Sequence, residues 1–363
     1  MKTGRNLQEV LVELNRQNQA KQDFISPAQG MRLREDGHTF EINHLTTSQQ
    51  EVFGTTSLFH RQVASALGIP AKYYDLMQKE KPELLAENVN SWFADKPSSY
   101  MVRSMDYGAG QVARALLSER YRRIDNMEIA TAVLPLFAGN DQYEVMSCEV
   151  TENRLYLKVV NHRLEMEVRK GDIVQAGVMI SNSEVGLGAV SIQPLVYRLV
   201  CTNGMVVNDA KARRYHVGRI ASTDDDFQIY SQETLDADDQ AFVLKLQDTV
   251  RAAVDEAKFA AVLDKMRESK DAKLNTADIP NVVKLASSNF KITEAESAGV
   301  LQHLIEGGDL TLYGLANAVT RYSQDVENYD RASKLEEIGY QVMTMSPKLF
   351  QAINQMQPVT LAA

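Results

Sequence analysis

Two blocks of the chain combine arginine with tyrosine, a pairing that proteins use to hold a single strand of nucleic acid. Guanidinium groups neutralise phosphates, and tyrosine rings offer faces on which unpaired bases stack, worth about 1–3 kcal/mol per base. The same residue types can instead form solvated turns, or ion pairs with Glu119, Asp125 and the acidic stretch that follows residue 221. The nucleic-acid prediction needs the two blocks to converge on one exposed surface. It assigns phosphate or base contacts to these residues: Arg103, Arg114, Arg120, Tyr121, Arg122, Arg123, Tyr197, Arg198, Lys211, Arg213, Arg214 and Arg219.

The stretch EVGLGAVSIQPLVYRLVCTNGM, residues 184–205, raises the question of a phosphate-binding loop. Dinucleotide-binding loops need a third glycine for close packing of helix against strand, and here that position is Ser191. No Gly-Lys-Ser or Gly-Lys-Thr follows, so the P-loop pattern is also missing. We interpret Gly186 and Gly188 as a structural turn, after which Pro194 limits how the next segment joins a sheet or starts a helix.

Catalytic motifs have little support. None of the six histidines forms a His-Glu-x-x-His pattern, and no Gly-x-Ser-x-Gly nucleophile motif occurs. Glu149, Glu152 and Lys158 have the residue types of a metal-dependent nuclease but the wrong spacing. The sequence therefore assigns no catalytic residue, no metal and no cofactor, and it favours a protein that is not an enzyme.

Composition and charge limit the partners. The chain has 363 residues and a net charge of −9. Residues 1–223 carry 26 basic and 25 acidic side chains, whereas residues 224–363 carry 13 and 23, so the acidity belongs to the C-terminal third. Cys148 and Cys201 are too few for a disulfide framework, and no apolar run is long enough to cross a membrane. We expect a cytoplasmic protein with no membrane partner.

The hydrophobic patterns predict an α+β fold, with a central, mostly antiparallel sheet, flanking helices and a C-terminal helical bundle. We expect a mainly helical region with a small hairpin over 1–98, an α+β core over 99–221, and an acidic linker with the bundle over 222–363. The hairpin turns at Asp36-Gly37.

Local signals predict the elements within these regions. Helices are expected at 7–18, at 56–67 with Thr56 as its cap, at 71–77, at 82–94 with Pro82 in its first turn, and at 127–137. Strands are expected at 100–105, 111–117, 143–150, 154–160, 163–168 and 173–181.

The C-terminal third is expected to begin with an acidic loop at 222–239 and one long helix at 242–267. A helix with a Thr293–Glu296 capping box should follow and end at Gly307, in a bundle of about five helices.

Several blocks resemble the phage- and plasmid-associated family named domain of unknown function 932. The resemblance runs from about His60 to Asp325, and its most specific parts are RYRRIDN and VCTNGM. The other blocks are GIPAKYYDLM, AENVNSWF, SNSEVGLGAVSIQPLVYRL and LYGLANAVTRYSQDV. It implies a mobile-element gene and residence in a bacterial cytoplasm, and it supplies no catalytic residues.

The order of elements is also similar, more loosely, to the core of the Erf-like single-strand annealing proteins of phages. Tyr197-Arg198 stands where those proteins carry a longer Thr-Tyr-x-Lys-Arg-Tyr run.

Three functions follow as hypotheses. The first is a mobile-element accessory protein that binds single-stranded DNA without sequence preference, in annealing or recombination, with the acidic region serving self-assembly into a homo-oligomer or recruitment of a partner protein. The second is an acidic interaction protein that binds or blocks a host factor. The third is a metal-dependent enzyme that acts on nucleotides or nucleic acid.

Overall fold

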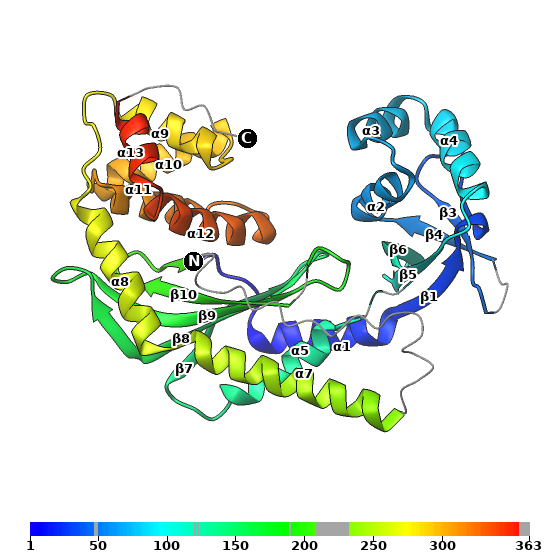
Figure 1. Cartoon of the computed structure of the whole chain (residues 1–363), viewed down its shortest axis with the longest axis horizontal. Helices are drawn as coiled ribbons and strands as arrows, with labels where there is room; N and C mark the ends of the chain where they lie inside the picture. The colour runs from blue at the N-terminus through cyan, green and yellow to red at the C-terminus, as the bar shows by residue number, and fades with distance from the viewer. Residues whose placement is uncertain (47–49, 120, 122, 189, 208–231, 356–363) are drawn as a thin grey trace.

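The computed structural model describes residues 1–46, 50–119, 121, 123–188, 190–207 and 232–355, which form two sheets and a helical bundle (Figure 1). The predicted α+β class is confirmed. The strands are β1 (Lys21–Pro27), β2 (Met31–Leu33), β3 (Phe40–Asn43), β4 (Gln50–Thr55), β5 (Ser99–Asp106), β6 (Gln111–Ser118), β7 (Tyr143–Val150), β8 (Leu155–Glu167), β9 (Ile173–Asn182), β10 (Ser191–Arg198) and β11 (Asn203–Val206).

The α-helices carry the labels of Figure 1, and none of those described has the length and apolar composition that crossing a bilayer requires. They are α1 (Leu7–Ala20), α2 (Ser57–Leu67), α3 (Ala71–Glu80), α4 (Pro82–Ala94), α5 (Asn126–Val133), α7 (Gln232–Ala253), α8 (Glu256–Asp271), α9 (Ile279–Asn289), α10 (Glu294–Gly307), α11 (Leu312–Tyr322), α12 (Tyr329–Met343) and α13 (Pro347–Asn354).

The first sheet has six strands in the order β1-β5-β6-β4-β3-β2, with a parallel pair between β4 and β6. Alternate residues of β3, Phe40 and Ile42, are buried against Phe59 of α2 and Phe93 of α4. β5 and β6 belong to this sheet, so the expected single central sheet is in fact two sheets. The region boundary expected after residue 98 falls between α4 and β5. Strands on both sides of that boundary share this sheet, because β5 pairs with β1 and β6 pairs with β4.

The second sheet has five antiparallel strands in the order β11-β10-β9-β8-β7. Its two faces differ, as β8 illustrates. Leu155, Leu157 and Val159 lie in the apolar core that includes residues of α1, α5 and α7, whereas Tyr156 and Lys158 point to the other face, which α12 covers (Figure 1). Strand alternation thus gives this sheet one apolar face and one mixed face, on which Lys158 lies beside apolar residues such as Val160 and Met179. Both faces are covered.

Two details of this sheet depart from expectation. The strands predicted at 154–160 and 163–168 are the single strand β8, in which a register shift between Asn161 and Glu165 bends the ladder. The segment containing Pro194 is a strand, and the carbonyl of Pro194 accepts the backbone N–H of Val207 at 2.8 Å.

The helices α8–α13 form the bundle, whose core also takes in Val174 and Val196 of the second sheet. The single helix predicted at 242–267 is wrong. Two helices occupy this range, because α7 ends at Ala253 and α8 begins at Glu256. The Asp255 side chain caps α8 by accepting the N–H of Lys258 at 3.1 Å. α9 was not predicted, and α7 begins at Gln232, so 232–239 is helix rather than loop and the rest of the expected acidic loop lies outside the described residues.

Several local predictions are confirmed. In the hairpin turn the Asp36 carboxylate accepts the N–H groups of His38 and Thr39, both at 2.8 Å. The Thr56 hydroxyl caps α2, Pro82 starts α4, and α10 has the predicted capping box and ends at Gly307.

Candidate functional site

Arg103 and Arg114, two of the predicted phosphate ligands, lie inside the protein. Their exposed fractions are 2% and 4%. The Arg103 guanidinium contacts the two carboxylate oxygens of Asp23 at 2.9 and 3.0 Å and one of Asp125 at 2.7 Å. Burial alone would lower the pKa of Arg103, but Asp23 and Asp125 raise it above its ordinary value. The expectation that these two side chains are exposed is wrong, because such a guanidinium cannot reach a phosphate without abandoning buried carboxylates.

The partner of Arg114 is Glu184, at the start of the glycine turn after β9. The two side chains are 3.5 Å apart, and the backbone carbonyl of Glu184 accepts from Arg103 at 2.9 Å. Glu184 also accepts the backbone N–H of Asn126, the first residue of α5, at 2.7 Å. These arginines therefore connect the first sheet to the second.

Tyr121 and Arg123, on the loop between β6 and α5, lie nearer the surface. Tyr121 is half-buried, and its hydroxyl donates to the carbonyl of Ser183 at 3.4 Å. The Arg123 side chain is 54% exposed and lies 3.2 Å from a carboxylate oxygen of Asp23.

Five of these side chains form one group, which we call the sheet-junction cluster: Lys21, Asp23, Arg103, Arg123 and Asp125. Asp23, on β1, and Asp125, before α5, are thus paired with cations within this cluster, while the Arg123 side chain stays 54% exposed.

The second arginine–tyrosine block is internal as well. Arg198 donates to both carboxylate oxygens of Asp172, at 2.6 and 3.0 Å, and its guanidinium carbon lies 5.4 Å from the centre of the Tyr313 ring. Burial would lower the pKa of Arg198, but the hydrogen bonds to Asp172 raise it above its ordinary value. Tyr197 is only 6% exposed, so it offers no face for a base, and the expectation that these two residues lie on the surface is also wrong.

The described members of the two blocks do not converge. Arg198 pairs with Val174 near the start of β9, whereas Glu184, the partner of Arg114, follows the end of that strand. β9 has ten residues, so about 30 Å separates the two positions. The other predicted ligands lie outside the described residues: Arg120, Arg122, Lys211, Arg213, Arg214 and Arg219.

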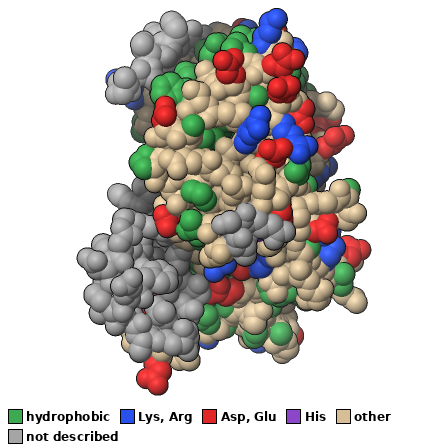
Figure 2. All heavy atoms as spheres, turned by 90° about the vertical axis from the view of Figure 1, so that its right-hand side faces the viewer, with side chains coloured by type: hydrophobic (Ala, Val, Ile, Leu, Met, Phe, Trp, Pro, Cys, Tyr) green, Lys and Arg blue, Asp and Glu red, His purple; other side chains and the backbone are tan. Residues whose placement is uncertain are grey.

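The face of the molecule nearest the first sheet also presents no continuous basic surface in its described part, because Lys and Arg side chains alternate there with Asp and Glu (Figure 2). Within the described ranges, no three His, Cys, Asp or Glu side chains are grouped as metal ligands would be.

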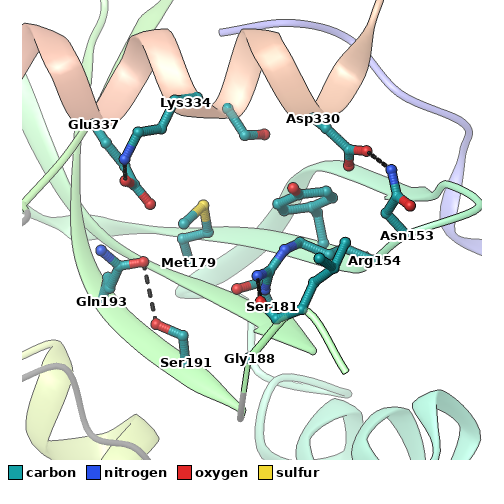
Figure 3. Close-up of a pocket in the computed structure, with 13 residues that line it drawn as sticks. Asn153, Arg154, Met179, Ser181, Gly188, Ser191, Gln193, Asp330, Lys334 and Glu337 are labelled. Carbon is teal, nitrogen blue, oxygen red and sulfur yellow. Dashed lines mark hydrogen bonds and ion pairs between the residues drawn. The ribbon is translucent and has the colours of Figure 1, made fainter. Parts of the chain in front are cut away.

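A different site lies between the mixed face of the second sheet and α12, where there is a cavity of about 360 Å³ (Figure 3). Strand pairing builds its floor, because residues in register on β8, β9 and β10 form rows across the sheet. One row is Tyr156, Ser181 and Ser191, and the next is Lys158, Met179 and Gln193. All of these except Lys158 line the cavity.

The roof and rim come from three other segments. The roof consists of residues on α12: Asp330, Ser333, Lys334 and Glu337. The rim consists of Asn153 and Arg154, before β8, and of Leu187 and Gly188, after β9. The glycine turn therefore has a structural role, as interpreted, and one of its glycines also borders the cavity.

Most charges of the cavity already have partners. Lys334 donates to Glu337 at 2.8 Å, and Asp330 accepts from Asn153 at 2.8 Å and from Thr151 at 2.9 Å. Arg154 is different. Its guanidinium donates to the carbonyl of Leu187, but no carboxylate of the described chain lies within ion-pair distance of it.

Gln193, on the floor of the cavity, has a buried amide nitrogen without a hydrogen-bond acceptor in the described part of the chain. It is 2% exposed, its Oε1 accepts from the Ser191 hydroxyl at 3.2 Å, and its Nε2 has no partner among the described atoms. Figure 3 shows the amide at the edge of the cavity, below Lys334 and Glu337. A buried polar group without a partner costs roughly 1–3 kcal/mol, so such a group calls for a reason, of which a bound molecule is one.

A buried ion pair holds the roof to the floor. Lys158 and Glu336 are both 0% exposed and lie 2.7 Å apart, and Lys158 Nζ also donates to the Ser333 hydroxyl at 3.1 Å. Burial would lower the pKa of Lys158, but Glu336 raises it above its ordinary value. We call Lys158, Glu336 and Ser333 the α12 clamp.

This cavity is not among the sites predicted from the sequence. A signal was present in LYLKVV, where Tyr156 and Lys158 alternate with three apolar residues, the pattern of a strand with one polar face. The roof residues could not be found in this way, because Lys158 and Ser333 are 175 residues apart.

Fold and site together define a two-sheet α+β protein with a polar cavity enclosed between a sheet and a helix of its C-terminal bundle. Residues 114–353, well over half of the chain, match the family described as Domain of unknown function (DUF932), and the protein belongs to that family. The family resemblance stated from the sequence is thereby confirmed. No curated protein and no solved structure matches the chain.

Proposed function

We propose that the protein binds a small organic anion in the cavity under α12. The observation that carries the proposal is the unmet Gln193 amide on the floor of a cavity whose rim carries the Arg154 guanidinium. Glu337 is paired with Lys334, and Asp330 accepts hydrogen bonds from the neutral groups of Asn153 and Thr151. The Arg154 guanidinium is therefore the cation of the rim that remains available to contact an anion. A cavity of a few hundred Å³ with a few convergent polar groups is typical of small-molecule sites.

The clamp supports the same proposal. An ion pair between fully buried groups gives little net stability, but it fixes the position of α12 over the sheet. A site held in this way binds its ligand without first having to order its own walls.

The experiment is a thermal-shift screen of the full chain with three kinds of anion: nucleoside monophosphates, sugar phosphates and dicarboxylates. At a concentration one hundred times its Kd, a ligand stabilises the folded state by about 2.7 kcal/mol. We expect at least one class to raise the Tm, and Arg154→Gln to abolish the rise. Arg163→Gln is the matched control, because Arg163 is 63% exposed and pairs with Asp141 away from the cavity.

The proposal fails if no anion raises the Tm. It fails equally if the variant Arg154→Gln responds as strongly as the control.

Single-strand binding is a second candidate, for which the described residues offer the loop between β6 and α5. It is supported by the exposed side chain of Arg123, beside which the sequence places Arg120 and Arg122. The basic run at 211–219 would contribute independently. Each phosphate neutralised contributes a slope of about −0.7 to log K against log salt.

Fluorescence anisotropy with labelled single-stranded and duplex DNA, at two salt concentrations, tests this candidate. We expect Arg122→Ala/Arg214→Ala to weaken binding and flatten the slope, while the control Arg163→Ala/Arg169→Ala changes neither. An affinity for DNA that does not change between the two salt concentrations would contradict the single-strand candidate.

The remaining expectations stay predictions from the sequence. They are the blocking of a host factor, metal-dependent catalysis, a homo-oligomer, cytoplasmic residence and the analogy to Erf-like proteins.

A further inference from the structure

We infer that the anion held under α12 is a nucleoside monophosphate, with its phosphate at Arg154 and its base at Gln193. This inference rests on the proposed function and adds the chemical class of the ligand. It depends on three features of the cavity: the separation of Arg154 and Gln193, the surface between them, and the charge at the inner end.

The distance between the donors follows from the register of the sheet. Gln193 lies in the row of Lys158, four residues along the strand direction from Arg154 and two strands away. With about 3.3 Å per residue and 4.8 Å per strand, their Cα atoms are roughly 16 Å apart. The Arg154 guanidinium ends at the Leu187 carbonyl on the rim, whereas the Gln193 amide stays on the floor, so a gap remains between the two groups. Inorganic phosphate is too small to touch both, whereas a ribose between phosphate and base supplies the spacer.

The surface between the donors suits a ring with polar edges. Met179 and Ser181, both on β9, lie in the middle of the floor, with Tyr156 of β8 on one side and Ser191 of β10 on the other, so apolar surface and hydroxyl groups are neighbours there. A base or sugar can lie against the former and hydrogen-bond to the latter.

The inner end favours an uncharged, hydrogen-bonding group. Ser191 can donate or accept, so whichever way the Gln193 amide is turned, one of its polar atoms remains free. The edge of a nucleobase offers both donors and acceptors to such an amide. A second anionic group there would approach Glu337, which already shares its charge with Lys334. This argues against a dicarboxylate.

Isothermal titration calorimetry of the full chain tests the inference. The probes are the four common nucleoside monophosphates, their nucleosides, ribose 5-phosphate and the dicarboxylate succinate. We expect the best nucleotide to bind at least tenfold tighter than both its nucleoside and ribose 5-phosphate. Arg154→Gln should reduce nucleotide affinity about tenfold and leave nucleoside affinity unchanged. Gln193→Met, of similar volume, should reduce the nucleotide to the affinity of ribose 5-phosphate, and Arg163→Gln should change nothing.

Each outcome has a separate meaning. If ribose 5-phosphate or a dicarboxylate binds as tightly as every nucleotide, the inference is overturned while the proposed anion site stands. If no anion of any class binds, the proposed function itself fails. The comparison among ligands uses the unmodified protein, so it decides the matter even if a variant is unstable.

Discussion

Replacing Lys158 by methionine should destabilise the protein strongly, because it leaves the Glu336 carboxylate buried without its cation. Both groups are 0% exposed and their charged atoms are 2.7 Å apart. At an effective dielectric constant of about 20, two unit charges at that separation attract by about 6 kcal/mol. Removing both from water costs several kcal/mol per ion, so the intact pair is nearly neutral in net terms. Lys158→Met keeps the cost of burying Glu336 and loses the attraction, which predicts a loss of about 3–5 kcal/mol.

The double variant Lys158→Met/Glu336→Met separates this reasoning from simple damage to packing. It removes both charges and fills the space with apolar atoms, so its free energy of unfolding should return to within about 1 kcal/mol of wild type or exceed it. Urea denaturation at pH 7 gives both numbers. The pKa of Lys158 is raised, so the pair's contribution is complete below the ordinary lysine value of 10.5 and is lost only as the pH rises past the higher folded value.

Two results would refute the argument. One is a loss of less than about 1 kcal/mol in the free energy of unfolding of Lys158→Met, since the Glu336 carboxylate would then be hydrated and not buried alone. The other is a double variant as unstable as the single one, since the loss would then come from shape and not from an unpaired charge.

Two further predictions concern other parts of the fold. Gly186 has φ +81°, and a Cβ there would lie 2.4 Å from Leu117 Cδ2, so Gly186→Ala should cost about 1–2 kcal/mol for the left-handed backbone and about 1 kcal/mol more for the clash. Gly171→Ala, with φ +82° and open space around it, should cost the backbone part alone, and equal losses in urea denaturation would contradict the steric contribution. Arg331 lowers the pKa of Glu296 to about 2 from 4.5, so this pair stabilises the fold above pH 4.5 and the stability is lost as the pH falls towards 2. Arg331→Met should therefore reduce the slope of the unfolding free energy against pH between 4.5 and 2. The largest reduction that one proton allows is about 1.4 kcal/mol per pH unit. An unchanged slope would contradict this prediction.

Local structure was predictable where neighbouring residues determine it. The hairpin turn at Asp36-Gly37, the Thr56 cap and the capping box of α10 each depend on hydrogen bonds between residues two or three positions apart. The missing break in the predicted helix at 242–267 had a local signal too, since Asp255 is a good N-cap. The apolar residues before and after Asp255 keep a helical spacing, and this pattern favoured one continuous helix over a cap at Asp255.

The division into two sheets was not predictable from one sequence. β5 pairs with β1, joining residues such as Lys21 and Met105 that are far apart in the chain, and no turn or spacing encodes this pairing. The assignment of Arg103 and Arg114 to a surface failed for a related reason. Each stands in the middle of a largely apolar strand, which indicates a buried cation, but its carboxylate partners come from distant segments.

The cavity under α12 shows the same limit. The alternation of Tyr156 and Lys158 with apolar residues could have indicated a polar sheet face. The burial of the Gln193 amide and the position of Arg154 at the rim depend on α12 and on the turn after β9, which are distant in the sequence.

A crystal structure of the full chain with a nucleoside monophosphate would test the central claim most directly. We predict density for the ligand between β10 and α12, with its phosphate at Arg154 and its base in hydrogen-bonding contact with Gln193. A structure in which the nucleotide occupies another place, while that cavity holds only water, would contradict the account.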